Sequence, residues 1–101
     1  MVYKLRYLPL AKEDLIEIAV YTQNIFKNLI AAGNILSKIE NAIFKRLENP
    51  EAYAVWQSSK KRELDYRIIN VGNYTIWYVV IGNVMEVRRI LYSRMDERKF
   101  L

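Results

Sequence analysis

The sequence predicts one α+β domain over residues 1–101, in which an N-terminal strand and a two-helix hairpin precede a three-stranded antiparallel meander. Residues 66–92 contain three runs rich in Val, Ile, Tyr and Trp, separated by two Gly-Asn dipeptides. Two stretches with helical spacing of apolar residues come before them, and a short alternating segment opens the chain. The predicted order is therefore β-α-α-β-β-β, in a chain long enough for one hydrophobic core and too short for two.

The N-terminal strand is expected over residues 2–8, where apolar and polar side chains alternate. Pro9 ends this strand and suits the first turn of a helix, so a helix is expected to follow. The helical spacing breaks at Lys27-Asn28, resumes, and ends at Asn49-Pro50. Two helices with such a short joint form an antiparallel hairpin.

The meander is expected to have strands at 64–71, 74–81 and 84–92. Glycine as the first residue of each two-residue loop suits a type II′ turn, whose twist matches that of paired strands. Two-residue loops then fix the register. The expected facing pairs are Val71 with Tyr74, Arg67 with Tyr78, Ile81 with Val84, and Trp77 with Arg88.

The two faces of this meander differ in what they require. We expect the helices and the first strand to complete one layered core, with the helices on the more apolar face. That face holds Ile69, Val71, Tyr74, Ile76, Tyr78, Val80, Met85, Val87 and Leu91. The opposite face carries Leu64, Tyr66, Ile68, Trp77, Val79, Ile90 and Tyr92 among polar residues, more apolar surface than a free monomer should expose. A bulge near Arg88-Arg89 would change these assignments.

The connection over residues 49–63 has no clean period and is expected to be held in place by Tyr53, Val55 and Trp56. Positive charge increases from its end onward. Residues 1–59 carry seven basic and six acidic groups, whereas residues 60–101 carry nine basic and five acidic groups. A net charge of +1 is thus followed by one of +4, which suits a polyanion or an acidic protein segment as partner. A solvated basic surface is the alternative explanation.

Composition excludes several function classes. The chain contains no Cys and no His, so thiol nucleophiles, disulfides and the commonest metal ligand are absent, and we expect no metal and no cofactor. No run approaches the length of a membrane span, and the N-terminus lacks a signal-peptide pattern, so a cytoplasmic protein is expected. No familiar catalytic motif occurs.

The remaining candidates for chemistry are Arg, Lys and Tyr. Cations can stabilise charge that develops on a phosphate, whereas Tyr assists proton transfer only if its pKa falls from about 10. A structural explanation competes for each candidate. Arg67 suits a cation–π contact with Tyr78, and Arg88 suits an ion pair with Glu86 and stacking on Trp77.

The segments YRIINVGNYTIWYVV and EVRRILYSRMD resemble the C-terminal half of the RelE/ParE superfamily of bacterial toxins. The segment LPLAKEDLIEIAVY resembles the opening helix of the same group. The resemblance spans nearly the whole chain. It implies the toxin of a type II toxin–antitoxin module, which inhibits growth, stabilises plasmids, is neutralised by a cognate antitoxin and forms a hetero-oligomer with it.

The superfamily divides into members that resemble RelE and cleave mRNA in the ribosome, and members that resemble ParE and poison DNA gyrase. Here Tyr74 is followed by Thr75, where nucleases commonly have Arg, and Tyr92 stands where one nuclease branch has its catalytic His. Arg94 matches a basic family position. The helical hairpin and the Arg94-Met95-Asp96 ending favour the gyrase-poison branch. The ribosome-dependent endoribonuclease stays open as the alternative, as does a family member that is not toxic.

These interpretations predict three sets of residues. If the protein is a nuclease, the resemblance implies that catalysis falls to Arg94, Arg88, Tyr92 and Arg67. The second meander face predicts antitoxin binding by Trp77, Ile68, Tyr66, Arg88 and Ile90. Charge and the resemblance predict target binding by Lys60, Lys61, Arg62, Arg94, Asp96 and Arg98, with gyrase or the ribosome and its mRNA as target.

Overall fold

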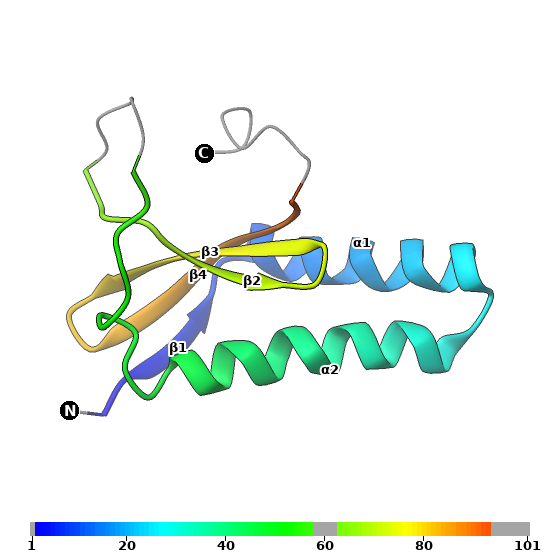
Figure 1. Cartoon of the computed structure of the whole chain (residues 1–101), viewed down its shortest axis with the longest axis horizontal. Coiled ribbons are helices and arrows are strands. Elements are labelled where there is room, and N and C mark those ends of the chain that lie inside the picture. The colour runs from blue at the N-terminus through cyan, green and yellow to red at the C-terminus, as the bar shows by residue number, and fades with distance from the viewer. Residues whose placement is uncertain (1, 58–62, 94–101) are drawn as a thin grey trace.

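The computed structural model describes residues 2–57 and 63–93, and these residues form a mixed four-stranded sheet with a helical hairpin on one face (Figure 1). The predicted order β-α-α-β-β-β is confirmed. The elements are β1 (Lys4–Tyr7), α1 (Pro9–Phe26), α2 (Leu29–Arg46), β2 (Arg67–Val71), β3 (Tyr74–Ile81) and β4 (Val84–Tyr92).

The sheet has the spatial order β1-β4-β3-β2, so the N-terminal strand lies at an edge. It pairs parallel to β4, while the three C-terminal strands form the predicted antiparallel meander. Both Gly-Asn dipeptides are two-residue hairpin loops. Gly72 has a φ of 56° and Gly82 a φ of 61°, values that L side chains rarely adopt and that a type II′ turn requires at its first central position. The predicted pairs at these hairpin ends are confirmed.

One predicted pair is wrong, because β4 contains an irregularity opposite Trp77 and Tyr78. Tyr78 pairs with Val87, but Trp77 pairs with Arg89 rather than Arg88. The extra residue inverts the alternation of side chains over the last part of β4. As a result Ile90, expected on the face opposite the helices, belongs to the helix-side core, and Leu91 leaves that core.

The helices begin and end as local signals predict. Leu8 is extended, and Pro9 occupies the first turn of α1. Lys27 adopts a left-handed conformation with a φ of 50°, which reverses the chain within two residues. The side chain of Asn28 then caps α2, with its Oδ1 atom accepting a hydrogen bond of 2.9 Å from the Ile30 amide.

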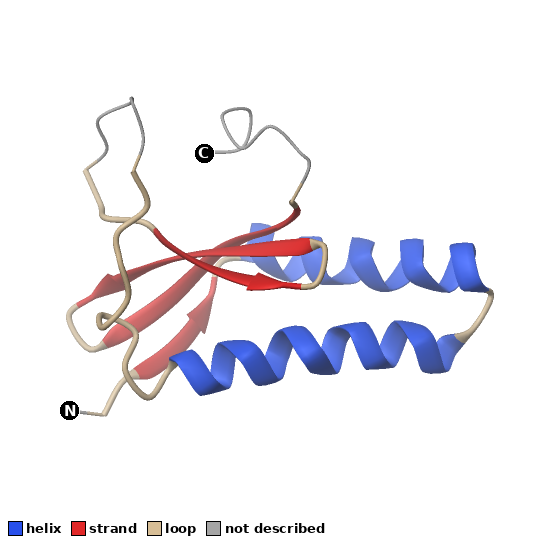
Figure 2. Ribbon diagram, viewed as in Figure 1, coloured by secondary structure: helices blue, strands red, loops and turns tan. Residues whose placement is uncertain are grey.

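The helical hairpin covers the face that the apolar pattern predicts. Figure 2 shows both helices lying on the same side of the sheet, with α1 contacting β4 and α2 contacting β2. The ends of the helices near the Lys27–Asn28 joint extend past the sheet (Figure 1), and Ile25, Leu29 and Ile30 are exposed there. The buried core consists of Ala11, Ile18, Ile39, Ile43, Ile69, Ile76, Tyr78, Met85, Val87 and Ile90.

The opposite face of the sheet is more covered than the sequence predicts. Trp77 is only 5% exposed and Val79 is fully buried, so the expectation of a large exposed apolar face is wrong. The ring of Trp56 packs edge-on against Trp77 with centroids 4.7 Å apart. The Trp56 amide donates a hydrogen bond of 2.7 Å to the carbonyl of Tyr66. Tyr66 is thus hydrogen-bonded to the connection that precedes the meander. The strand β2 begins at Arg67 rather than at the predicted residue 64.

Candidate functional site

An Arg–Glu–Arg cluster is the main charged feature of the face opposite the helices. Glu86 lies on β4 opposite Val79 and is 4% exposed. One of its oxygens accepts a hydrogen bond of 2.8 Å from Arg88, and the other accepts one of 2.8 Å from Arg6 of β1. Two arginines share this single buried carboxylate, so two positive charges and one negative charge leave the cluster with a net charge of +1. The predicted pair of Arg88 with Glu86 is confirmed.

Arg88 contacts an aromatic ring, and that ring belongs to Tyr66 rather than to Trp77, the predicted neighbour. Its guanidinium lies 5.9 Å from the ring centroid of Tyr66, within the range of a cation–π contact. Tyr66, just before β2, and Ile68, within it, are both half-buried. The structure thus brings together Tyr66 and Arg88 from the predicted antitoxin surface, whereas Ile90 lies on the other side of the sheet, 2% exposed.

A second buried ion pair joins α1 to the end of β4. Arg89 donates two hydrogen bonds, of 2.9 and 3.0 Å, to the two carboxylate oxygens of Asp14. The Ile90 amide donates a third hydrogen bond, of 2.9 Å, to Asp14. Ile90 lies on the part of β4 that follows the residues paired with β1. The pKa of Arg89 is raised, first by its hydrogen bond to Asp14. Asp14 therefore fixes the helix against the strand.

Tyr78 and Arg46 form a third polar cluster at the C-terminal end of α2. The hydroxyl of Tyr78 donates a hydrogen bond of 2.7 Å to the carbonyl of Pro50 and accepts one of 2.9 Å from Arg46. Arg46 also donates to the carbonyl of Ile68, and its guanidinium lies 3.4 Å from the ring centroid of Tyr53. Burial raises the pKa of Tyr78. The predicted pairing of Arg67 with Tyr78 across β2 and β3 is confirmed, and Arg67 also donates a hydrogen bond of 2.8 Å to the carbonyl of Tyr53.

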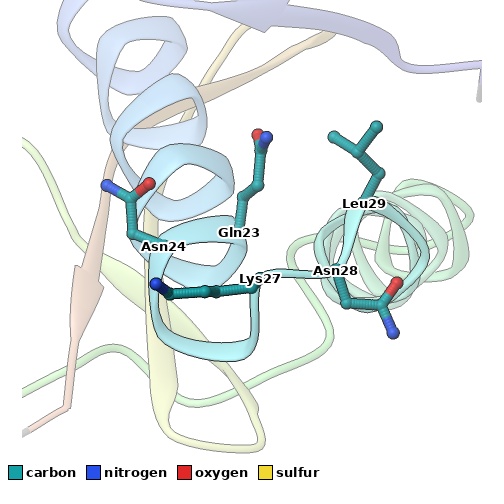
Figure 3. A pocket seen from close by; sticks show the side chains of 5 residues that line it. All are labelled: Gln23, Asn24, Lys27, Asn28 and Leu29. Atoms are coloured by element: carbon teal, nitrogen blue, oxygen red, sulfur yellow. The ribbon is translucent and has the colours of Figure 1, made fainter.

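A shallow hollow lies at the joint between the helices. Figure 3 shows its lining side chains, which come from the end of α1 and the start of α2: Gln23, Asn24, Lys27, Asn28 and Leu29. These are amides, one cation and one apolar residue. No carboxylate pair for acid–base chemistry lines it. Within residues 2–57 and 63–93, no group of three acidic side chains is arranged to hold a metal ion.

Several predicted residues lie outside the described part of the chain. These are Lys60, Lys61, Arg62, Arg94, Asp96 and Arg98. Of the predicted catalytic set, Arg88 and Arg67 are held in the contacts above, and Tyr92 packs edge-on against Tyr74 with ring centroids 5.9 Å apart. Among the residues that the structure describes, Arg67, Arg88 and Tyr92 thus contact different neighbours: Tyr53, Glu86 and Tyr74.

Three residues that complete these clusters were not predicted from the sequence: Asp14, Arg6 and Arg46. A signal existed for Asp14, because it occupies a position in the buried stripe of α1 between Ala11 and Ile18. An acidic residue at a buried helix position requires a partner. Neither Arg46 nor Arg6 differs in sequence pattern from an exposed cation, so only packing identifies them.

Comparison with known proteins decides the family. A family model described as the ParE toxin of the type II toxin–antitoxin system parDE matches residues 5–97. This chain belongs to the ParE toxin family. A search of curated protein sequences finds no match.

Solved structures similar to this ParE family member agree in fold. A chain of the chromosomal ParDE system of P. aeruginosa has a TM-score of 0.76 at 15% identity, covering 90% of this chain and 96% of that one. The RelE–RelB complex of Pyrococcus horikoshii OT3 gives 0.60 at 13% identity, covering 95% and 100%. The RelB–RelE complex of Methanococcus jannaschii gives 0.52 at 20% identity, covering 95% and 99%. At these identities, the similarity concerns the fold.

Proposed function

We propose that this toxin acts on DNA gyrase without cleaving RNA, and that a cognate antitoxin neutralises it in a cytoplasmic hetero-oligomer. The observation that carries this proposal is that the arginines of the sheet form ion pairs with carboxylates of the same chain. Arg88 and Arg6 share the buried carboxylate of Glu86, and Arg89 is held by Asp14. A ribonuclease needs cations directed at the reacting phosphate. Cations already engaged by carboxylates lose much of that capacity.

Two tyrosines of β3, Tyr74 and Tyr78, are poorly suited to act as general bases. A tyrosine can act as a general base near neutral pH only if its pKa is lowered. Burial instead raises the pKa values of Tyr74 and Tyr78. With no His in the chain, a strong acid–base group for RNA cleavage is not evident among residues 2–57 and 63–93. A toxin that acts by binding requires none.

Two findings support the proposal of an antitoxin partner: membership of the ParE family, and the similarity in fold to solved toxin–antitoxin structures. Each of these relatives is described as a toxin–antitoxin system or complex. We propose that Tyr66, Ile68 and Arg88, which are partly exposed, contribute to antitoxin binding. Neither described helix is long and apolar enough to cross a bilayer.

The test uses the purified full chain in two parallel reactions. One contains bacterial gyrase with relaxed plasmid, ATP and increasing toxin; the other contains ribosomes programmed with an mRNA. We expect loss of supercoiling with accumulation of cleaved plasmid, and intact mRNA. Adding the antitoxin encoded by the neighbouring gene should restore supercoiling. Cleavage of the mRNA on the ribosome would overturn the gyrase proposal.

Two variants sharpen this test. Arg94→Ala should lower RNA cleavage by about 100-fold or more if Arg94 contacts a transition state, but should leave a gyrase poison active. Deletion of residues 96–101 should reduce gyrase inhibition if Asp96 and Arg98 contact the target, while antitoxin still co-purifies. Replacing Lys60, Lys61 and Arg62 with neutral residues should likewise reduce gyrase inhibition if they contact the target, while antitoxin still co-purifies. Activity in neither reaction, with retained antitoxin binding, would identify a family member that is not toxic.

A further inference from the structure

The outward side of α1 exposes more apolar surface than a solvated helix requires. Leu10, Ile16, Val20 and Tyr21 are 52%, 64%, 51% and 62% exposed. With Glu13 and Glu17, which are also exposed, they recur every three or four residues and so share one side of the helix. We call this set of six residues the α1 outer face.

This face is opposite the side of α1 that holds the domain together. Ala11, Asp14, Ile18 and Thr22 are buried and point to the sheet side of the helix. The α1 outer face therefore lies outside the buried core, and more than half of each of its four apolar residues remains exposed to water. Exposed apolar residues that cluster in this way, with charged residues between them, are typical of an interaction surface.

The charge of the α1 outer face has the opposite sign from that of the whole protein. The chain has a net charge of +5, whereas the α1 outer face carries the two carboxylates of Glu13 and Glu17, with the exposed cation Lys12 at its margin. Arg89 does not cancel the charge of these carboxylates, because its own charge is bound by Asp14 through two hydrogen bonds. Glu13 directly precedes Asp14 and Glu17 follows it by three residues, so both glutamates lie on the same part of the helix.

We propose that the α1 outer face binds an amphipathic helix with basic flanking residues, supplied by a partner protein. Exposed side chains on a helix, without free backbone groups, suit a partner that satisfies its own backbone hydrogen bonds, as a helix does. The stretch from Leu10 to Tyr21 spans about 16 Å at the rise of an α-helix, or about three turns of a partner helix. A second copy packed α1 on α1 would bring like charges together, and an acidic segment would be repelled.

The proposal does not depend on whether gyrase is the target. Its test uses two fluorescein-labelled 18-residue probes with the same leucine pattern, one with lysine and one with glutamate at the polar positions. Fluorescence anisotropy with the full chain should show binding of the Leu/Lys probe that weakens with added salt. The net charge of +5 alone would favour the Leu/Glu probe. Equal or tighter binding of the Leu/Glu probe, or binding of neither, overturns the proposal.

Three variants locate the binding. The double variant Ile16→Ser/Val20→Ser should lower the affinity for the Leu/Lys probe at least about tenfold, because apolar anchors dominate such contacts. Glu13→Gln/Glu17→Gln should flatten the salt dependence. Phe44→Ser, at an exposed residue of α2, is the matched control and should bind like the parent. Circular dichroism and thermal melting verify that each variant is folded.

Two outcomes would assign the surface differently. Unchanged binding by Ile16→Ser/Val20→Ser would place the probe elsewhere and overturn the proposal. Sedimentation equilibrium provides the other check. A dimer of the parent chain that dissociates in Ile16→Ser/Val20→Ser would show that a second copy covers the α1 outer face, and would also overturn it.

Discussion

Replacing Asp14 with alanine should destabilise the domain strongly, although Asp14 is a single acid in a chain with excess positive charge. Its carboxylate accepts three hydrogen bonds, two from Arg89 and one from the Ile90 amide. The side chains of Asp14 and Arg89 are 8% and 15% exposed. Breaking a buried ion pair typically costs about 3–5 kcal/mol, because the remaining charge is left without a partner.

The expected loss for Asp14→Ala is about 3 kcal/mol or more, because Arg89 retains slight access to water and the orphaned Ile90 amide adds to the cost. For a domain of this size, that loss lowers the melting temperature by about 10–20 °C. Urea unfolding followed by circular dichroism at pH 7 measures it. Glu13→Ala is the matched control. It removes the same charge from the next residue, which is exposed, and should change the free energy of unfolding by less than about 0.5 kcal/mol.

A double variant tests the cause of the effect. Asp14→Leu/Arg89→Met removes both charges and replaces them with apolar groups, so it should lose less stability than Asp14→Leu alone. If Asp14→Ala costs less than about 1 kcal/mol, or if the double variant loses the sum of the two single losses, the ion pair does not hold α1 to β4 and the reasoning is refuted.

Three further predictions follow from the same structure. Gly72→Ala should lower the free energy of unfolding by about 1 kcal/mol, because residue 72 has a positive φ. Gly33→Ala, inside α2 with open space where a Cβ would stand, should raise it by about 0.5–1 kcal/mol. Changes of the same sign in the two variants, measured by urea unfolding, would contradict this. Burial raises the pKa of Tyr78 above 10.0, so its contribution to stability is present below pH 10 and falls as pH rises through the folded value. Tyr78→Phe should therefore flatten the alkaline decline in melting temperature, and should cost about 1–3 kcal/mol at neutral pH by leaving polar partners unpaired. In a Trp56→Phe background, the emission of Trp77 should be blue-shifted in the free protein, and emission typical of solvent-exposed tryptophan would show that Trp77 is not buried.

The local patterns in this sequence determined most of the fold. Pro9, the Lys27–Asn28 joint and the two Gly-Asn turns act through backbone geometry within a few residues, so their effects are readable without a structure. The choice of the helix-covered face was also predictable, because that face of the meander has the larger share of apolar side chains. The same patterns carried the family resemblance that the ParE family model confirms.

Tertiary structure decided what local patterns leave undetermined. The extra residue in β4 moved Ile90 into the core, and the sequence could mark only the neighbourhood of that irregularity. Burial of Trp77 depends on Trp56, which is 21 positions away and lies in a segment without a regular period. Arg89, the partner of Asp14, and Arg6, the second partner of Glu86, are 75 and 80 residues away from these acids in sequence. Which cation meets which carboxylate at such separations is set by how the helix and the strands pack, because a charged side chain has the same local pattern whether it is paired or solvated.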